Sequence, residues 1–256
     1  MSGTEDLDEV EQHRMPLIEH LAELRKRVFV ALGAVAVGMT ISFGFFDPMY
    51  AWLTAPVLEA MAANGLEGGG LSIVHSPFEG VYTYLRVALV GGAVLSSPVV
   101  AFQVWQFVAP GLYNTEKRIV FPLAMASSAL FLTGALFCYY AIFPLAFPFF
   151  FSIIDAQPNL SVGGYLSAIV RMMLAFGLCF QLPVGTFFLA RVGLIDHRDM
   201  LGSFRYAVVA IFIVAALITP PEVLTQVMLA LPLVCLYVIG IGVAWISTTK
   251  VRDLEG

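Results

Sequence analysis

Long apolar runs separated by short polar stretches dominate the sequence. A transmembrane helix needs about 20 consecutive, mostly apolar residues. Six segments approach or meet that length, and they predict six membrane-spanning helices over roughly residues 28–46, 83–107, 119–143, 166–190, 206–219 and 224–246. We therefore expect an all-α, polytopic membrane protein whose single six-helix domain covers residues 28–246.

The last two predicted spans are interrupted by proline. Tyr206 to Thr219 makes a helix of about 21 Å at 1.5 Å per residue, which is less than the roughly 30 Å of a hydrocarbon core. Pro220 and Pro221 prevent its continuation, because proline has no backbone N–H to donate. Pro232 interrupts the next apolar run. We predict that helices 5 and 6 are shortened.

The segment before the first span has a helical pattern of its own. Leucines recur at helical spacing between Pro16 and Arg27, which predicts an amphipathic cytoplasmic helix over residues 15–27. Glu23 and Arg27 are four residues apart and are expected to pair. Residues 1–14 are rich in acids and predict a disordered tail, and residues 247–256 predict a cytoplasmic C-terminal tail. Because the first apolar run begins only after this charged segment, it is expected to be a retained span and not a cleaved signal peptide.

Basic residues are segregated to one side of the predicted bundle. Eleven of the 13 Lys and Arg residues lie on the side that holds both termini. They are Arg14, Arg25, Lys26, Arg27, Lys117, Arg118, Arg191, Arg198, Arg205, Lys250 and Arg252. The opposite loops, residues 47–82, 144–165 and 220–223, contain none. Since cytoplasmic loops carry the excess of Lys and Arg, both termini are predicted to be cytoplasmic.

Composition excludes several classes of protein. The chain is 59% hydrophobic and 12% charged, with a mean hydropathy of +0.88, whereas soluble domains have about 25% charged residues. The three cysteines lie inside apolar runs without metal-ligand spacing, and no hydrolase, P-loop or dinucleotide-binding motif occurs. We predict neither an enzyme nor a metal site, no cofactor and no nucleic-acid partner.

Three polar residues have two interpretations each from residue type alone. Glu116, in a loop that is otherwise basic, either lies in the first turn of the third span or binds a cationic ligand. Gln181, deep in the fourth span, is expected to hydrogen-bond across a helix interface, for structure or for a partner. Glu222, after the proline pair, is either an exposed acid on a turn or lies below the outer surface.

Five stretches together resemble one family. In order they are HLAELRKR, QVWQFVAPGLYNTEKR, FPLAF, AFGLCFQLPV and ITPPEVLTQ, and they cover nearly the whole chain from Pro16. They are similar to the TatC family of twin-arginine translocases. The resemblance implies a glove-shaped, six-span receptor for folded proteins whose signal peptides carry paired arginines. It also implies export driven by the proton motive force and a multi-pass location in the cell inner membrane, or in the thylakoid membrane for a plastid protein.

The resemblance also assigns roles to individual residues and implies partners. Glu23 and Glu116 would receive the twin arginines, and Arg25 would support the same cytoplasmic site. Four further positions match family motifs and would be partner-subunit contacts or structural residues: Pro56, Phe107, Gln181 and Glu222. The implied partners are single-span proteins similar to TatA and TatB, the signal peptide, the lipid bilayer and further copies of the chain. With glutamine at position 181, the resemblance does not imply a titrating acid there, and hydrogen bonding to a partner helix is the role left open.

The chemistry of arginine explains why this site would use two acids. A guanidinium presents a rigid fork of donors that a carboxylate accepts in bidentate fashion, so two arginines require two carboxylates. The basic residues Arg25, Lys26 and Arg27 would repel stray cations. Lysine, a point charge, should substitute poorly.

Two other classes of function are compatible with the sequence. A small secondary transporter would account for six spans and a half-length helix, although we find no internal repeat and no charged pair near the midplane. A membrane scaffold whose acids merely cap helices is the third hypothesis. Solute uptake by liposomes would favour the transporter, and binding of a twin-arginine signal peptide would favour the receptor.

Overall fold

Helices make up the regular structure of the protein. The computed structural model describes residues 17–63, 77–108, 120–153, 162–218 and 223–255, so Glu116 and Glu222 lie outside the described residues. Within these ranges every regular element is a helix and no strand occurs. The prediction of an all-α protein is confirmed.

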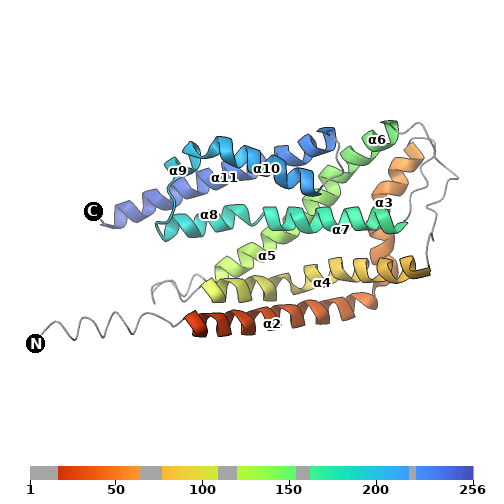
Figure 1. Ribbon diagram of the computed structural model, residues 1–256, viewed down its shortest axis with the longest axis horizontal. Coiled ribbons are helices and arrows are strands. Elements are labelled where there is room, and N and C mark those ends of the chain that lie inside the picture. The colour runs from red at the N-terminus through yellow and green to blue at the C-terminus, as the bar shows by residue number, and fades with distance from the viewer. Residues whose placement is uncertain (1–16, 64–76, 109–119, 154–161, 219–222, 256) are drawn as a thin grey trace, which may run out of the picture.

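Eleven helical elements follow one another along the described chain. They are α2 (Leu17–Phe43), α3 (Phe46–Ala63), α4 (Pro77–Val108), α5 (Val120–Phe137), the π-helix η3 (Cys138–Ile142), α6 (Phe143–Ile153), α7 (Val162–Cys179), α8 (Leu182–Arg191), α9 (His197–Gly202), α10 (Phe204–Ile218) and α11 (Val223–Glu255). Figure 1 shows the beginning of α2, the end of α4 and the end of α11 at the same end of the bundle, with α3 and α6 at the other. We call these the α2 end and the α3 end.

Five apolar stretches of the described residues are long enough to cross a membrane. They are Glu19–Phe43, Phe78–Val108, Val120–Phe149, Gly164–Arg191 and Gln226–Ile246, and Phe204–Ile218 is a shorter apolar helix. The sequence separates residues 15–27 from the first span, yet α2 is one continuous helix because no proline interrupts it. Helix 6 is not shortened as a helix, since α11 has 33 residues. What is short is its apolar part, Gln226–Ile246, which has 21 residues and is the shortest of the five apolar stretches.

Two glycines bring α2 and α4 into close contact. A Cβ atom added to Gly38 would lie 2.9 Å from the carbonyl oxygen of Gly92, and one added to Gly92 would lie 2.5 Å from Cγ of Met39. Real side chains cannot occupy that space, so the absence of a Cβ at both positions allows the two backbones to meet. This contact fixes which residues of α2 face which residues of α4.

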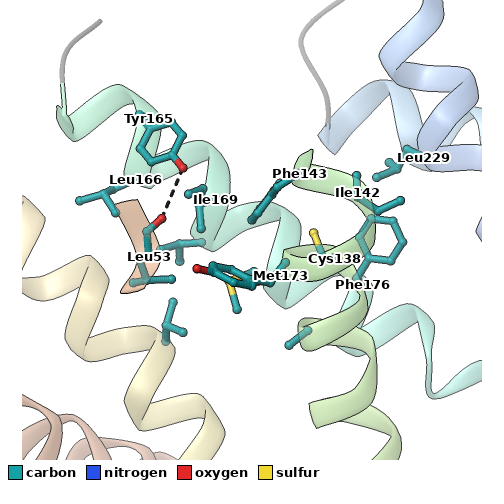
Figure 2. Packing of buried hydrophobic residues seen from close by; sticks show 14 of the residues in the cluster. Leu53, Cys138, Ile142, Phe143, Tyr165, Leu166, Ile169, Met173, Phe176 and Leu229 are labelled. Atoms are coloured by element: carbon teal, nitrogen blue, oxygen red, sulfur yellow. Dashed lines mark hydrogen bonds between the residues drawn. The ribbon is translucent and has the colours of Figure 1, made fainter. Parts of the chain in front are cut away.

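The largest apolar core lies toward the α3 end. Figure 2 shows its packing around Leu53 of α3, Cys138 of η3, Phe143 of α6 and Phe176 of α7, all of them buried. Helix α3 crosses the ends of α4 and α7 in Figure 1 and contributes one side of this core. The core therefore joins α3 to the spans.

Pro56 accounts for one of two tyrosine hydrogen bonds to α3 in this core. A proline inside a helix has no N–H for the carbonyl four residues earlier, which here belongs to Trp52. The hydroxyl of Tyr139 donates to that carbonyl, and the hydroxyl of Tyr165 donates to the next one, Leu53, at 3.3 Å (Figure 2). Pro56 is buried, as a structural residue would be.

The fourth span is interrupted between α7 and α8. Residues 180 and 181 form a turn, and Pro183 lies in the first turn of α8, where its missing N–H costs no helical hydrogen bond. Gln181 stands at this break. The interruption leaves its side chain near α5, whose backbone it reaches.

Candidate functional site

Four polar side chains meet between α2 and α4 at the α2 end. Arg27 of α2 donates from Nη2 to Oε1 of Glu23, at 3.1 Å, which confirms the expected pairing. It donates from Nη1 to the amide oxygens of Gln103, at 3.3 Å, and of Gln106, both on α4. We call these four residues the Arg27 cluster. Helix spacing forms it, because Glu23 and Arg27 share one face of α2, and Gln103 and Gln106 share one face of α4.

The Arg27 cluster is partly shielded from solvent and is neutral in sum. The side chains of Arg27 and Glu23 are 26% and 22% exposed. The Nε atom of Arg27 is buried and has no acceptor among the described residues. Oε2 of Glu23 likewise receives no hydrogen bond in the described part of the chain. Beside the formed ion pair, the buried Nε of Arg27 and Oε2 of Glu23 thus have no partner among the described residues.

Phe107 and Arg25 lie beside this cluster. The ring of Phe107 at the end of α4 stacks on His20 of α2, with centroids 4.4 Å apart. The stack is a second link between the two helices at the same end. The side chains of Arg25 and Lys26 are exposed on α2. The structure thus brings Glu23, Arg25 and Phe107 to one end of the molecule.

An apolar cavity of about 350 Å³ lies deeper along α4. Residues of α2, α4, α5, α7 and α8 line it, together with Gln181. Its hydroxyl groups are already engaged: Ser97 bonds Ser128 at 2.9 Å, and Ser127 accepts from Nε1 of Trp105 at 2.7 Å. Trp105 lines the cavity and is adjacent in sequence to Gln106, so the cavity lies next to the Arg27 cluster along α4.

Gln181 is a structural link on the wall of this cavity. Its amide nitrogen donates to the carbonyl of Ser127 on α5, at 3.0 Å, and to that of Gly177 on α7, at 3.4 Å. Such hydrogen bonds between membrane helices contribute roughly 0.6–2 kcal/mol. The expected bond across a helix interface is present within this chain. A contact with a partner helix stays a prediction.

The predicted site residues are therefore spread over the molecule. Glu23, Arg25 and Phe107 lie at the α2 end, Gln181 lies on the cavity wall, and Pro56 lies in the core toward the α3 end. Glu116 and Glu222 fall outside the described residues, so whether Glu116 joins Glu23 stays a prediction.

Sequence reasoning missed the roles of Gln103 and Gln106. In the sequence both are merely polar residues near the end of the second predicted span. Their separation of three residues indicated a shared face, but only the packing of α2 on α4 shows that this face meets Arg27.

Comparison with known proteins decides the family. The family model described as Sec-independent protein translocase protein (TatC) matches residues 19–232. A TatC protein of Desulforapulum autotrophicum is 41% identical over 233 residues, covering 90% of this chain and 84% of that protein. The chain belongs to the TatC family. A TatC protein of Escherichia coli is 36% identical over 245 residues, covering 94% and 92% of the two chains.

A solved structure agrees with this assignment. The crystal structure described as twin arginine translocase receptor TatC matches this TatC-family chain with a TM-score of 0.77 and 34% identity, covering 90% of this chain and 99% of that one. The chain is thus a multi-pass membrane component of Sec-independent protein translocation, which is a transport role. The family assignment favours the receptor hypothesis over the secondary transporter and the scaffold.

Proposed function

We propose that this TatC-family chain is the receptor that binds twin-arginine signal peptides of folded proteins at the α2 end. In this proposal the α2 end faces the cytoplasm, both termini are cytoplasmic, and the chain lies in the cell inner membrane. It assembles with single-span proteins similar to TatA and TatB for export driven by the proton motive force.

The Glu23 carboxylate is the observation that carries the proposal. It already accepts a guanidinium at 3.1 Å, from Arg27, and therefore has the position and exposure that an arginine ligand requires. Its second oxygen has no donor among the described residues. A peptide arginine brings the same chemical group to the same acceptor. Glu116, outside the described residues, is proposed to receive the second arginine.

The cavity supports a place for the apolar part of the signal peptide. This part follows the arginines in the peptide, and the cavity follows the Arg27 cluster along α4. Each buried CH₂ group contributes about 0.8 kcal/mol, so even three leucine-sized side chains would add several kcal/mol to the binding of the arginines. We propose that the apolar segment enters the cavity beside Trp105.

Partner proteins are proposed on the basis of exposed apolar helix faces. Val209, Ile213 and Leu217 of α10 are 58%, 57% and 76% exposed, and they recur every four residues on one face. A single-span helix can cover such a face, although lipid can cover it too. Glu222 is proposed to lie near this contact, because it follows α10 closely in sequence.

The proposal is tested by exchanging one carboxylate for an amide. Glu23→Gln preserves the shape of the side chain and removes its charge. We expect the affinity for a synthetic twin-arginine signal peptide to fall at least tenfold, because charged hydrogen bonds contribute about 1.5–3 kcal/mol each. Binding is measured by fluorescence anisotropy on the purified protein in detergent, with membrane abundance measured in parallel.

Glu19→Gln is the matched control. Glu19 is exposed on the same helix, one turn earlier, and its exchange removes the same charge. It should change the affinity by less than about threefold, as expected for an exposed charge. Wild-type affinity of the Glu23→Gln protein would contradict the proposal.

A further inference from the structure

Glu23 is not an empty acceptor in this structure. Nη2 of Arg27 lies 3.1 Å from Oε1 of Glu23, so the carboxylate already holds a guanidinium of its own chain. The two charges cancel, and both side chains are about one quarter exposed, so solvent screens them only in part. A cationic ligand therefore meets a neutral pair instead of a bare anion.

An incoming cation has two routes to this carboxylate. It can bind Oε2 while Arg27 stays on Oε1. This arrangement is unfavourable, because it places two positive charges beside one carboxylate. Alternatively it can replace Nη2 of Arg27. The second route is favoured by the other bonds of Arg27. Its Nη1 donates to Gln103 and Gln106, and it keeps those bonds when Nη2 leaves Glu23. The glutamines thus provide Arg27 with acceptors in the displaced state.

We infer that Arg27 is a specificity-determining residue that occupies Glu23 in the unliganded receptor and must be displaced by a matching guanidinium. A peptide arginine replaces the lost contact between Arg27 and Glu23 with an equivalent guanidinium–carboxylate contact. A lysine offers only a point charge and cannot reproduce it. The internal ion pair therefore lowers the affinity for every cation but lowers it more for lysine. This inference rests on the proposed function, because it concerns the same carboxylate.

The test exchanges Arg27 for a neutral side chain that still fits between the helices. Arg27→Gln frees Glu23, and the affinity for a twin-arginine signal peptide should rise roughly tenfold, as expected on removal of a like charge a few ångströms away. The affinity for the twin-lysine version of the same peptide should rise more. The ratio of the two affinities should consequently fall at least fivefold.

Lys26→Gln is the matched control for charge. It removes one positive charge from an exposed side chain of the adjacent residue. Its affinities should change by less than about threefold, and the arginine-to-lysine ratio should stay at the wild-type value. A rise as large as that of Arg27→Gln would overturn the inference, because the effect would then reflect net charge alone.

A second variant separates this role from a structural one. Gln103→Leu combined with Gln106→Leu removes the acceptors that hold displaced Arg27, so twin-arginine affinity should fall several-fold. If Arg27 served only to hold α2 against α4, both this double variant and Arg27→Gln would bind the peptide more weakly. Changes of affinity in opposite directions support the inference, and changes in the same direction overturn it. If Arg27→Gln protein does not accumulate, unchanged affinity of the double variant alone overturns it.

The inference and the proposed function fail in different ways. If wild-type protein shows no preference for the twin-arginine peptide, the proposed function itself is refuted. If wild type binds with that preference and Glu23→Gln abolishes it, the function stands. An unchanged ratio in Arg27→Gln then refutes only the role of Arg27.

Discussion

The hydrogen bond from the hydroxyl of Tyr139 to the Trp52 carbonyl should contribute measurably to the free energy of unfolding. We expect this because Pro56 leaves that carbonyl without its usual backbone donor. Tyr139→Phe removes the hydroxyl and preserves the ring, which stacks on Trp52 with centroids 3.9 Å apart. An unsatisfied buried polar group costs about 1–3 kcal/mol, and hydrogen bonds between membrane helices average about 0.6 kcal/mol. We therefore expect a loss of about 1 kcal/mol.

A double-mutant cycle tests the cause of this loss. In Pro56→Ala, the new backbone N–H can donate to the Trp52 carbonyl, as in an ordinary helix. The hydroxyl of Tyr139 then becomes redundant, so Tyr139→Phe in that background should cost less than about 0.3 kcal/mol. The difference between the two backgrounds is the coupling energy of Pro56 and Tyr139.

Thermal unfolding in detergent, followed by tryptophan fluorescence at one fixed scan rate, provides the measurement. A loss of about 1 kcal/mol should lower the Tm by about 2–4 °C in a chain of this length. Tyr140→Phe is the control, because Tyr140 is the adjacent tyrosine and is 64% exposed. Equal losses from Tyr139→Phe in the wild-type and Pro56→Ala backgrounds would refute the explanation.

Two further predictions concern contacts between spans. Gly92→Val should lower the Tm by several degrees and weaken peptide binding, because its side chain would collide with Met39 and separate α2 from α4, whereas Gly33→Val, with nothing within 4 Å of an added Cβ, should not. Thermal unfolding and peptide binding check both variants. Gln181→Leu removes the bond to Ser127 and should reduce recovery of single-span partner proteins with the purified protein; unchanged co-purification would count against a partner role for this residue.

Local sequence signals predicted the helices and one half of the site. The six apolar runs follow from hydrophobic length alone, and the short fifth helix follows from the proline pair after Thr219. The ion pair of Glu23 and Arg27 follows from a spacing of four residues on one helix. Each of these signals lies within a single segment and needs no knowledge of how segments pack.

The other half of the site depends on packing that no local pattern specifies. Gln103 and Gln106 are 76 and 79 residues from Arg27 and reach it only because α2 and α4 meet at one register. That register is fixed by Gly38 and Gly92, whose contact shows in the sequence only as two more glycines in apolar runs.

The interruptions within helices were only partly accessible to local reasoning. The turn at residues 180 and 181 has a local signal, because Pro183 begins the next helix, whereas residues 138–142 of the π-helix contain none that must break a helix. Both interruptions occur inside continuous apolar runs. The length of such a run predicts a membrane span but does not indicate whether the helix within it is continuous.

The 15 residues of α10 extend about 22 Å, some 8 Å less than a typical hydrocarbon core. Lipid that borders this helix is expected to thin unless a partner helix shields it, and mismatch costs a fraction of a kcal/mol for each ångström. A bilayer in contact with this flank of the protein would therefore be thinner than beside the longer helices. A polar chain that crosses the membrane beside α10 would pass through a thinner hydrocarbon layer than beside the longer helices.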